Sequence, residues 1–189
     1  ATLMMSPLRV EFLANPKHGI TLHGQPLTPT HIALFVSVIP NLARLVLSPI
    51  WGYLFDRMNF FVLRITLNTG FALGAISFFV GGDVFWLVVA AILFGISNAG
   101  ADVAWSLWVT KFAPPERVAD YMSVHTFFTG VRGVIAPLVA FYLIAGMPLN
   151  YAGWICAGLI VVGTSLLVPE IKAGKLARPG AALTEEVAE

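Results

Sequence analysis

The chain has 189 residues, of which 58% are hydrophobic and only 11% are charged, and its formal net charge is +1. An ordinary soluble domain carries about 25% charged residues, so a water-soluble fold could not bury this much apolar surface. The near-neutral charge and the lack of a basic tract predict no nucleic-acid partner. The lone Cys156 excludes a disulfide framework and a cysteine-based metal site within this sequence. We expect it to be a buried packing residue, and we expect no metal or cofactor.

The apolar residues form long runs, which predict transmembrane helices. A helix needs about 20 mainly apolar residues to cross a bilayer, whereas barrel strands are short and alternating. The predicted fold is therefore an all-α membrane protein, a helical bundle over residues 1–170 with five complete spans and part of a sixth. In chain order, the predicted spans are 1–14 (partial), 31–55, 60–80, 84–110, 117–145 and 150–168.

Polar connections separate these spans. The first, over residues 15–30, is rich in proline and glycine, which favour turns and loops. The later connections are short and leave no room for a soluble domain. From residue 171 to 189 the chain is polar and rich in small residues, so we expect a disordered tail.

Basic residues gather on one side of the predicted bundle, and short cytoplasmic loops hold an excess of Lys and Arg. The other side has Lys17, in the connection that also holds His18 and His23. We therefore expect a cytoplasmic C-terminus and place the protein in a bacterial inner (plasma) membrane. The basic residues on the cytoplasmic side are Arg57, Arg64, Lys111, Arg117, Lys172, Lys175 and Arg178.

Two arginines lie near the middle of predicted spans, where a charge is costly and usually faces a cavity or the bundle interior. Arg44 shares a helical face with Asn41. Arg132 shares one with Thr129 and His125. These positions predict a polar path between the helices.

A third polar stripe, on the span 84–110, contains Asn98, Asp102 and Trp105. The alternative to a substrate site is an internal ion-pair network in which Asp102 neutralises an arginine. Asp102 and His125 are candidates for carrying a coupling proton, and the alternative for both is a structural role. The predicted substrate-binding residues are Arg44, Arg132, Asn41, Thr129 and Asn98.

Several glycines and prolines lie within the predicted spans. Pro49 and Pro137 remove backbone hydrogen bonds and predict bends in their helices. Small side chains allow helices to approach closely. We expect such packing at Gly70, Gly74, Gly130 and Gly133.

Two short motifs mark the predicted cytoplasmic turns, and their order and spacing resemble the major facilitator superfamily of secondary transporters. The resemblance covers residues 1–170. In that family, glycine, three residues and Asp-Arg form a signature between the second and third helices of each six-helix half. Here the usual glycine and basic pair that follow are replaced by Met58-Asn59. The motifs are Gly52-x-x-x-Asp56-Arg57 and Pro114-Pro115-Glu116-Arg117.

The resemblance implies a fragment, the C-terminal half of a longer chain, with the N-terminal half missing. The alternative is that the chain is itself an N-terminal half. It places the three polar faces on counterparts of helices that line the family's central cavity. It implies a cytoplasmic gating motif at Gly52, Asp56 and Arg57. The alternative for Asp56 is the N-cap of the following helix.

The predicted function is secondary active transport of a small solute, as a symporter or antiporter, by alternating access. Two fixed cations favour an organic or inorganic anion held by charge-assisted hydrogen bonds. One alternative is a non-transporting membrane sensor or assembly factor on the same fold. Another is a permease subunit driven by a separate ATPase. No catalytic constellation is present in the sequence, so we expect no enzyme.

Overall fold

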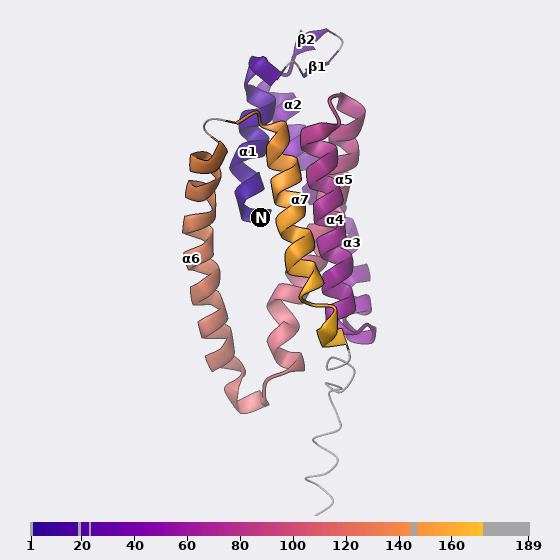
Figure 1. The fold of residues 1–189 in the computed structure, drawn as a ribbon. Helices are drawn as coiled ribbons and strands as arrows, with labels where there is room; N and C mark the ends of the chain where they lie inside the picture. The colour runs from indigo at the N-terminus through magenta and orange to yellow at the C-terminus, as the bar shows by residue number, and fades with distance from the viewer. Residues whose placement is uncertain (1, 19, 23, 145–146, 172–189) are drawn as a thin grey trace, which may run out of the picture.

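The computed structural model describes residues 2–18, 20–22, 24–144 and 147–171, and most of them are helical (Figure 1). Nearly all of the predicted tail lies outside these residues. A short antiparallel hairpin, β1 (Thr21–Leu22) and β2 (Gln25–Pro26), lies in the first connection. The helices are α1 (Thr2–Ala14), η1 (Pro16–His18), α2 (Pro29–Ala33), η2 (Leu34–Val38), α3 (Ile39–Arg57), α4 (Phe60–Val80), α5 (Val84–Leu107), η3 (Trp108–Lys111), η4 (Pro115–Arg117), α6 (Val118–Ile144), α7 (Asn150–Ser165) and η5 (Pro169–Ile171).

Several continuous helical segments are long and apolar enough to cross a membrane. The predicted all-α membrane fold is therefore confirmed. The predicted span 150–168 contains α7, whose 16 residues are fewer than the roughly 20 that a span needs, so that span stays a prediction. Within the described residues, the four spanning segments are Pro29–Arg57, Phe60–Val80, Val84–Lys111 and Pro115–Tyr142.

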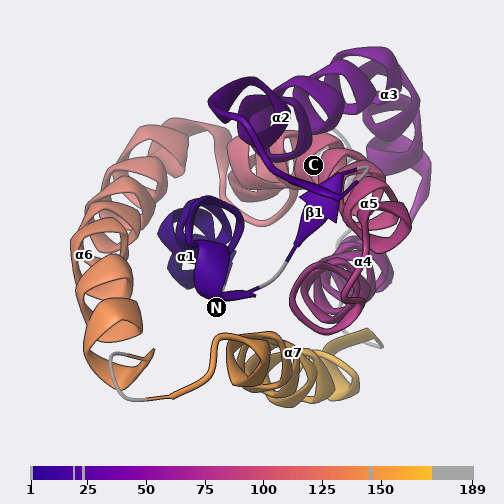
Figure 2. The ribbon, with the colours of Figure 1, turned by 90° about the horizontal axis from the view of Figure 1, so that it is seen from above.

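The long helices surround α1 (Figure 2). On one side α5 packs against both α3 and α4, and α4 packs in turn against α7. On the other side α6 packs mainly against α1 and stands apart from the tightly packed group (Figure 1). The bundle therefore consists of a compact set of four helices, with α1 lying between that set and α6.

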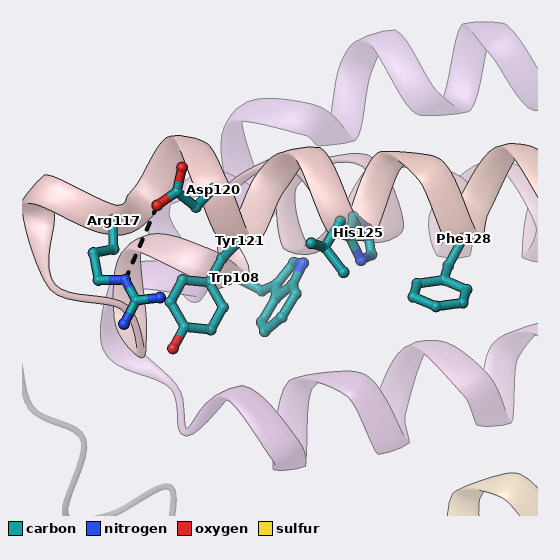
Figure 3. Close-up of a pocket in the computed structure, with 7 residues that line it drawn as sticks. Trp108, Arg117, Asp120, Tyr121, His125 and Phe128 are labelled. Carbon is teal, nitrogen blue, oxygen red and sulfur yellow. Dashed lines mark ion pairs between the residues drawn. The ribbon is translucent and has the colours of Figure 1, made fainter.

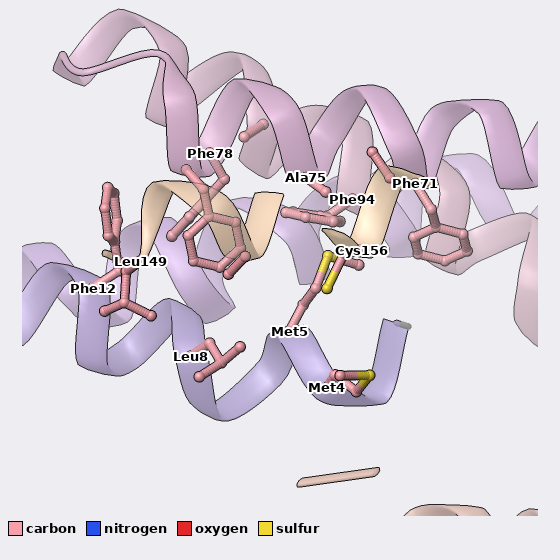
Figure 4. Packing of buried hydrophobic residues seen from close by; sticks show 14 of the residues in the cluster. Met4, Met5, Leu8, Phe12, Phe71, Ala75, Phe78, Phe94, Leu149 and Cys156 are labelled. Carbon is pink, nitrogen blue, oxygen red and sulfur yellow. The ribbon is translucent and has the colours of Figure 1, made fainter. Parts of the chain in front are cut away.

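A buried apolar cluster fixes α1 against the compact set. Met5 and Leu8 of α1 are almost fully buried, as is Phe78 of α4. Figure 4 shows these side chains directed toward one another across the helices. Cys156 of α7 is buried in the same cluster, which is the packing role expected of it.

Close helix contact at two predicted glycines is confirmed. A side chain added at Gly70 of α4 would collide with Ser97 of α5, and one at Gly74 would come within 3.2 Å of Phe94. The two helices therefore approach more closely than larger residues would permit. Along α6, by contrast, an added Cβ would meet nothing within 4 Å at Gly130 or Gly133.

Polar side chains begin two of the long helices. The Asn59 Oδ1 accepts a hydrogen bond of 2.8 Å from the Phe61 backbone N–H and caps α4. Asp83 caps α5 in the same way, accepting from the Trp86 N–H at 3.1 Å. Asp56 lies instead in the last turn of α3. The capping role that was the alternative for Asp56 is therefore wrong, because Asn59 supplies the cap.

The first complete span is not a regular α-helix. A π-helical segment, η2, joins α2 to α3, and Pro40 lies in the first turn of α3. Proline donates no backbone hydrogen bond, and its ring crowds the carbonyl four residues earlier, here that of Val36. Val36 lies within the π-helical segment, where the wider turn accommodates this crowding. Pro49 and Pro137 lie inside α3 and α6, and the bends expected there stay predictions.

Candidate functional site

Arg44 and Asp102 lie on neighbouring helices and form an ion pair. The Arg44 Nε of α3 contacts the Asp102 Oδ2 of α5, and each side chain is about half exposed, at 47% and 46%. Ser48, one turn after Arg44, donates its hydroxyl to the Arg44 carbonyl at 2.7 Å. The charge of Arg44 is therefore balanced within the chain, as in the internal network that was the alternative to a substrate site.

Arg132 has a different environment, on the face of an aromatic ring. Its guanidinium carbon lies 4.6 Å from the centroid of Trp105. The guanidinium of Arg64, from α4, lies 5.0 Å from the same centroid. Neither arginine forms an ion pair with a carboxylate among the described residues. Two cations from different helices therefore share one indole ring, and cation–π attraction stabilises each by about 0.5–2 kcal/mol.

His125 and Trp108 extend this aromatic group. The His125 ring centroid lies 4.7 Å from that of Trp105 and 5.2 Å from that of Trp108. The His125 Nε2 and the Trp108 Nε1 are both buried and have no hydrogen-bond partner in the structure. An indole N–H can only donate, and buried donors are rarely left without an acceptor. The pattern indicates a site for a hydrogen-bond acceptor.

A cavity of about 370 Å³ adjoins these two side chains along one face of α6 (Figure 3). At its far end Arg117 and Asp120 form a long ion pair of 4.0 Å. The Arg117 guanidinium also lies 5.5 Å from the centroid of Tyr121. The cavity lining is Trp108, Arg117, Asp120, Tyr121, Val124, His125 and Phe128.

The structure thus separates the predicted site residues into two groups. Arg44 of α3 pairs with Asp102 of α5, while Arg132 and His125 of α6 meet at Trp105, about one turn further along α5. The other three predicted polar residues lie on the same helices as these groups. Asn41 is exposed on α3, and Asn98 and Thr129 are partly buried on α5 and α6.

The predicted gating motif lies at the end of α3. Arg57 places its guanidinium 4.1 Å from the centroid of Tyr53, whereas Asp56 is exposed. Lys111 of η3 donates to the Phe55 carbonyl and lies 4.2 Å from the centroid of the Phe55 ring. A cation beside the last carbonyls of a helix complements the negative end of its dipole. Lys111 therefore ties the end of α3 to the end of the α5 segment.

Two arginines that lie against aromatic rings between the helices are not predicted as site residues by the sequence. The sequence places Arg64 among the cytoplasmic basic residues, because it lies near the start of its span. Arg9 of α1 lies 4.6 Å from the centroid of Phe94 and 6.0 Å from that of Phe78. Its Nε and Nη1 are buried without a hydrogen-bond partner. A basic residue inside the apolar run of the first helix was the signal that could have found Arg9.

Comparison with known proteins agrees with the fold and the motifs. A family model described as Major Facilitator Superfamily matches residues 6–186, almost the whole chain. No curated protein and no solved structure matches the chain significantly. Members of this family are integral membrane proteins that carry small solutes across the lipid bilayer. The chain belongs to the major facilitator superfamily of membrane transporters.

Proposed function

We propose that this protein carries a small anionic solute across the membrane by alternating access, with Arg132 in its binding site. Transmembrane transport follows from the family, and the charged residues of α6 support the proposal of an anionic solute. The observation that carries the proposal is the position of Arg132, inside a spanning helix and on the face of Trp105, without a carboxylate partner among the described residues. Ionised groups inside a membrane protein usually mark a substrate or ion path.

Arg132 is a better candidate than Arg44 for direct contact with the anion. Asp102 already balances Arg44, so an incoming anion would have to compete with an existing carboxylate. Arg132 lies over the face of the Trp105 ring, which attracts its charge but accepts no strong hydrogen bonds. Its N–H groups are therefore suited to charge-assisted hydrogen bonds with the solute. Asn41, Asn98 and Thr129 remain proposed neighbours of the solute along the same path.

The ion pair supports a proposed route for proton coupling. A proton on Asp102 would neutralise its carboxylate and release Arg44, so proton binding and anion binding would favour one another. This linkage is that of a proton–anion symporter. His125 is a second candidate for the proton, because its Nε2 is buried without a partner beside the arginine cluster.

Alternating access requires a second wall for the cavity. We propose that an N-terminal half of the same protein supplies it and that the two halves rock about a site near the midplane. Gly52, Asp56 and Arg57 would then hold the cytoplasmic side closed. The excess of basic residues on that side supports a cytoplasmic C-terminus in a bacterial inner membrane.

The test is uptake by the intact protein in phosphatidylcholine vesicles. The probes are radiolabelled phosphate, succinate and lactate, and the variants are Arg132→Ala and Arg44→Ala. We expect Arg132→Ala to lower anion uptake at least tenfold, with a smaller effect of Arg44→Ala. Lys17→Ala, which removes an exposed cation from η1, is the control and should match the wild type.

Normal anion uptake by both arginine variants would overturn the assignment of these residues. Uptake of neutral but not anionic probes by the wild type would overturn the anionic substrate class. A wild-type protein that is folded and moves no solute would favour the sensor alternative instead.

A further inference from the structure

We infer that Arg64, Trp105 and Arg132 form a two-arginine clamp that binds a small dianion, such as a dicarboxylate or hydrogen phosphate. The inference rests on the proposed anion transport and deepens it. It adds Arg64, from a helix without a predicted polar face, and it specifies the charge of the solute.

The first support is the convergence of two guanidinium groups on one ring. Their central carbons lie 5.0 Å and 4.6 Å from the Trp105 centroid, so two positive charges adjoin one indole ring. Like charges repel, and the repulsion is weakly screened away from bulk water. The arrangement is therefore costly unless an anion compensates it, and the indole alone does not supply that charge.

The second support is a pair of unpartnered ring nitrogens beside Trp105. The Trp108 Nε1 is a buried donor without an acceptor, and the His125 Nε2 is equally unpartnered. Both rings belong to the same aromatic group as Trp105, because His125 contacts each of the two indoles. Oxygen atoms of an anion held by the arginines would supply the acceptor that the Trp108 N–H lacks, and would accept from the His125 Nε2 in the tautomer that carries its proton there. Side chains from α4, α5, η3 and α6 thus converge on one kind of ligand.

The third support is the charge balance. No carboxylate forms an ion pair with Arg64 or Arg132 within the described part of the chain. A monoanion would leave one guanidinium uncompensated, whereas a dianion balances both. Two guanidinium groups also offer bidentate hydrogen bonds that match two carboxylates or the oxygens of a phosphate.

A cavity adjoins this clamp through His125, which lines it and contacts Trp105. It reaches from Arg117, at the start of α6, to His125, beside Trp105. The volume of about 370 Å³ admits a small organic dianion. Arg117 presents a further positive charge in this cavity, paired only loosely with Asp120 at 4.0 Å.

The decisive experiment measures charge selectivity in the intact protein. Counterflow of radiolabelled succinate, phosphate and lactate is compared in phosphatidylcholine vesicles for the wild type, Arg64→Gln and Arg64→Lys. We expect Arg64→Gln to lower dianion counterflow at least tenfold, with lactate counterflow changed less than threefold. Arg64→Lys keeps the charge and should recover part of the dianion counterflow, and Lys17→Gln should match the wild type.

The experiment distinguishes failure of the clamp from failure of the proposed anion transport. If Arg64→Gln keeps the wild-type ratio of succinate to lactate while Arg132→Gln loses both, the clamp is wrong and anion transport stands. A wild type that carries only lactate would also overturn the clamp, whereas a wild type that carries no anion would overturn the proposed function itself.

A lipid headgroup carries the same phosphate chemistry as a free anion. The counterflow is therefore repeated in vesicles containing phosphatidylglycerol. If the effect of Arg64→Gln is seen only there, the cluster binds a headgroup and the solute clamp is wrong. If Arg64→Gln does not fold, Arg64→Lys is the deciding variant. An unchanged ratio of succinate to lactate counterflow, together with an unchanged apparent affinity for succinate, would contradict a bidentate clamp.

Discussion

Arg44 and Asp102 join α3 to α5 through an ion pair inside the predicted membrane region. The pair connects two helices that also pack closely along their length. It therefore combines a structural contact with the carboxylate that we propose as the site of the coupling proton. These two properties lead to separate predictions.

For stability, we expect Asp102→Asn to lower the thermal transition of the purified protein, because Arg44 is left without its counter-charge. Both side chains are half exposed, so we expect a loss of only about 1 kcal/mol. The double variant Arg44→Gln with Asp102→Asn should lie closer to the wild type than Asp102→Asn alone. Differential scanning fluorimetry in detergent checks this order, and Asp120→Asn, at an exposed and loose pair, is the matched control. Additive losses in the double variant would contradict direct coupling.

For coupling, we expect Asp102→Asn to abolish uptake driven by a pH gradient while counterflow of the same anion continues. The amide cannot gain or lose a proton, so solute exchange and proton movement become separated. Uptake into vesicles with and without an imposed gradient measures the effect. If the variant still concentrates the anion in response to the gradient, Asp102 does not carry the proton, and His125→Gln becomes the variant to measure.

The glycines of α5 predict a steric effect. An added Cβ at Gly100 would collide with Leu67 and come within 2.7 Å of the Trp51 ring, so Gly100→Leu has no space in this packing. We expect a loss of stability of about 1–3 kcal/mol or failure to fold. Gly158→Leu in α7 is the matched control, because nothing lies within 4 Å of that position. Folded yield and thermal stability should fall for the first variant and not for the second.

Asn59 makes two separable contacts. Its Oδ1 caps α4, and its Nδ2 donates to the Ile171 carbonyl at 2.9 Å. Asn59→Ala removes both contacts and should cost about 1–2 kcal/mol, whereas Asn59→Asp keeps the cap and should cost less. Thermal unfolding of the two variants tests this difference. Equal losses would show that the contact with Ile171, and not the cap, carries the stabilisation.

The spans illustrate what the sequence can predict. Apolar length alone placed the second and third complete spans at 60–80 and 84–110, and the structure has Phe60–Val80 and Val84–Lys111. The physical reason is strong, because a lipid environment requires long apolar helices with satisfied backbones. The π-helical segment ahead of Pro40 was not predicted, because hydropathy does not distinguish one kind of helical turn from another.

The site was less predictable than the spans. Helical spacing placed Arg44 and Arg132 on polar faces but could not say which helix each face meets. The packing of the helices brings Arg44 to Asp102 and Arg132 to Trp105. The contact of Arg64 with Trp105 was not predicted either, because it also depends on helix packing. The position of Arg64 near the end of a span does not indicate which neighbouring helix its long side chain contacts.

The loose attachment of α6 gives the cluster around Trp105 a mechanical property. Arg132 and His125 lie on this helix, whereas Trp105 and Arg64 belong to the compact set of helices. Any rigid shift of α6 away from α5 lifts Arg132 off the indole while the packing of α3, α4, α5 and α7 is preserved. The cluster is thus shared between α6 and the compact set, so the separation of α6 from α5 sets the distance between Arg132 and the other side chains of the cluster.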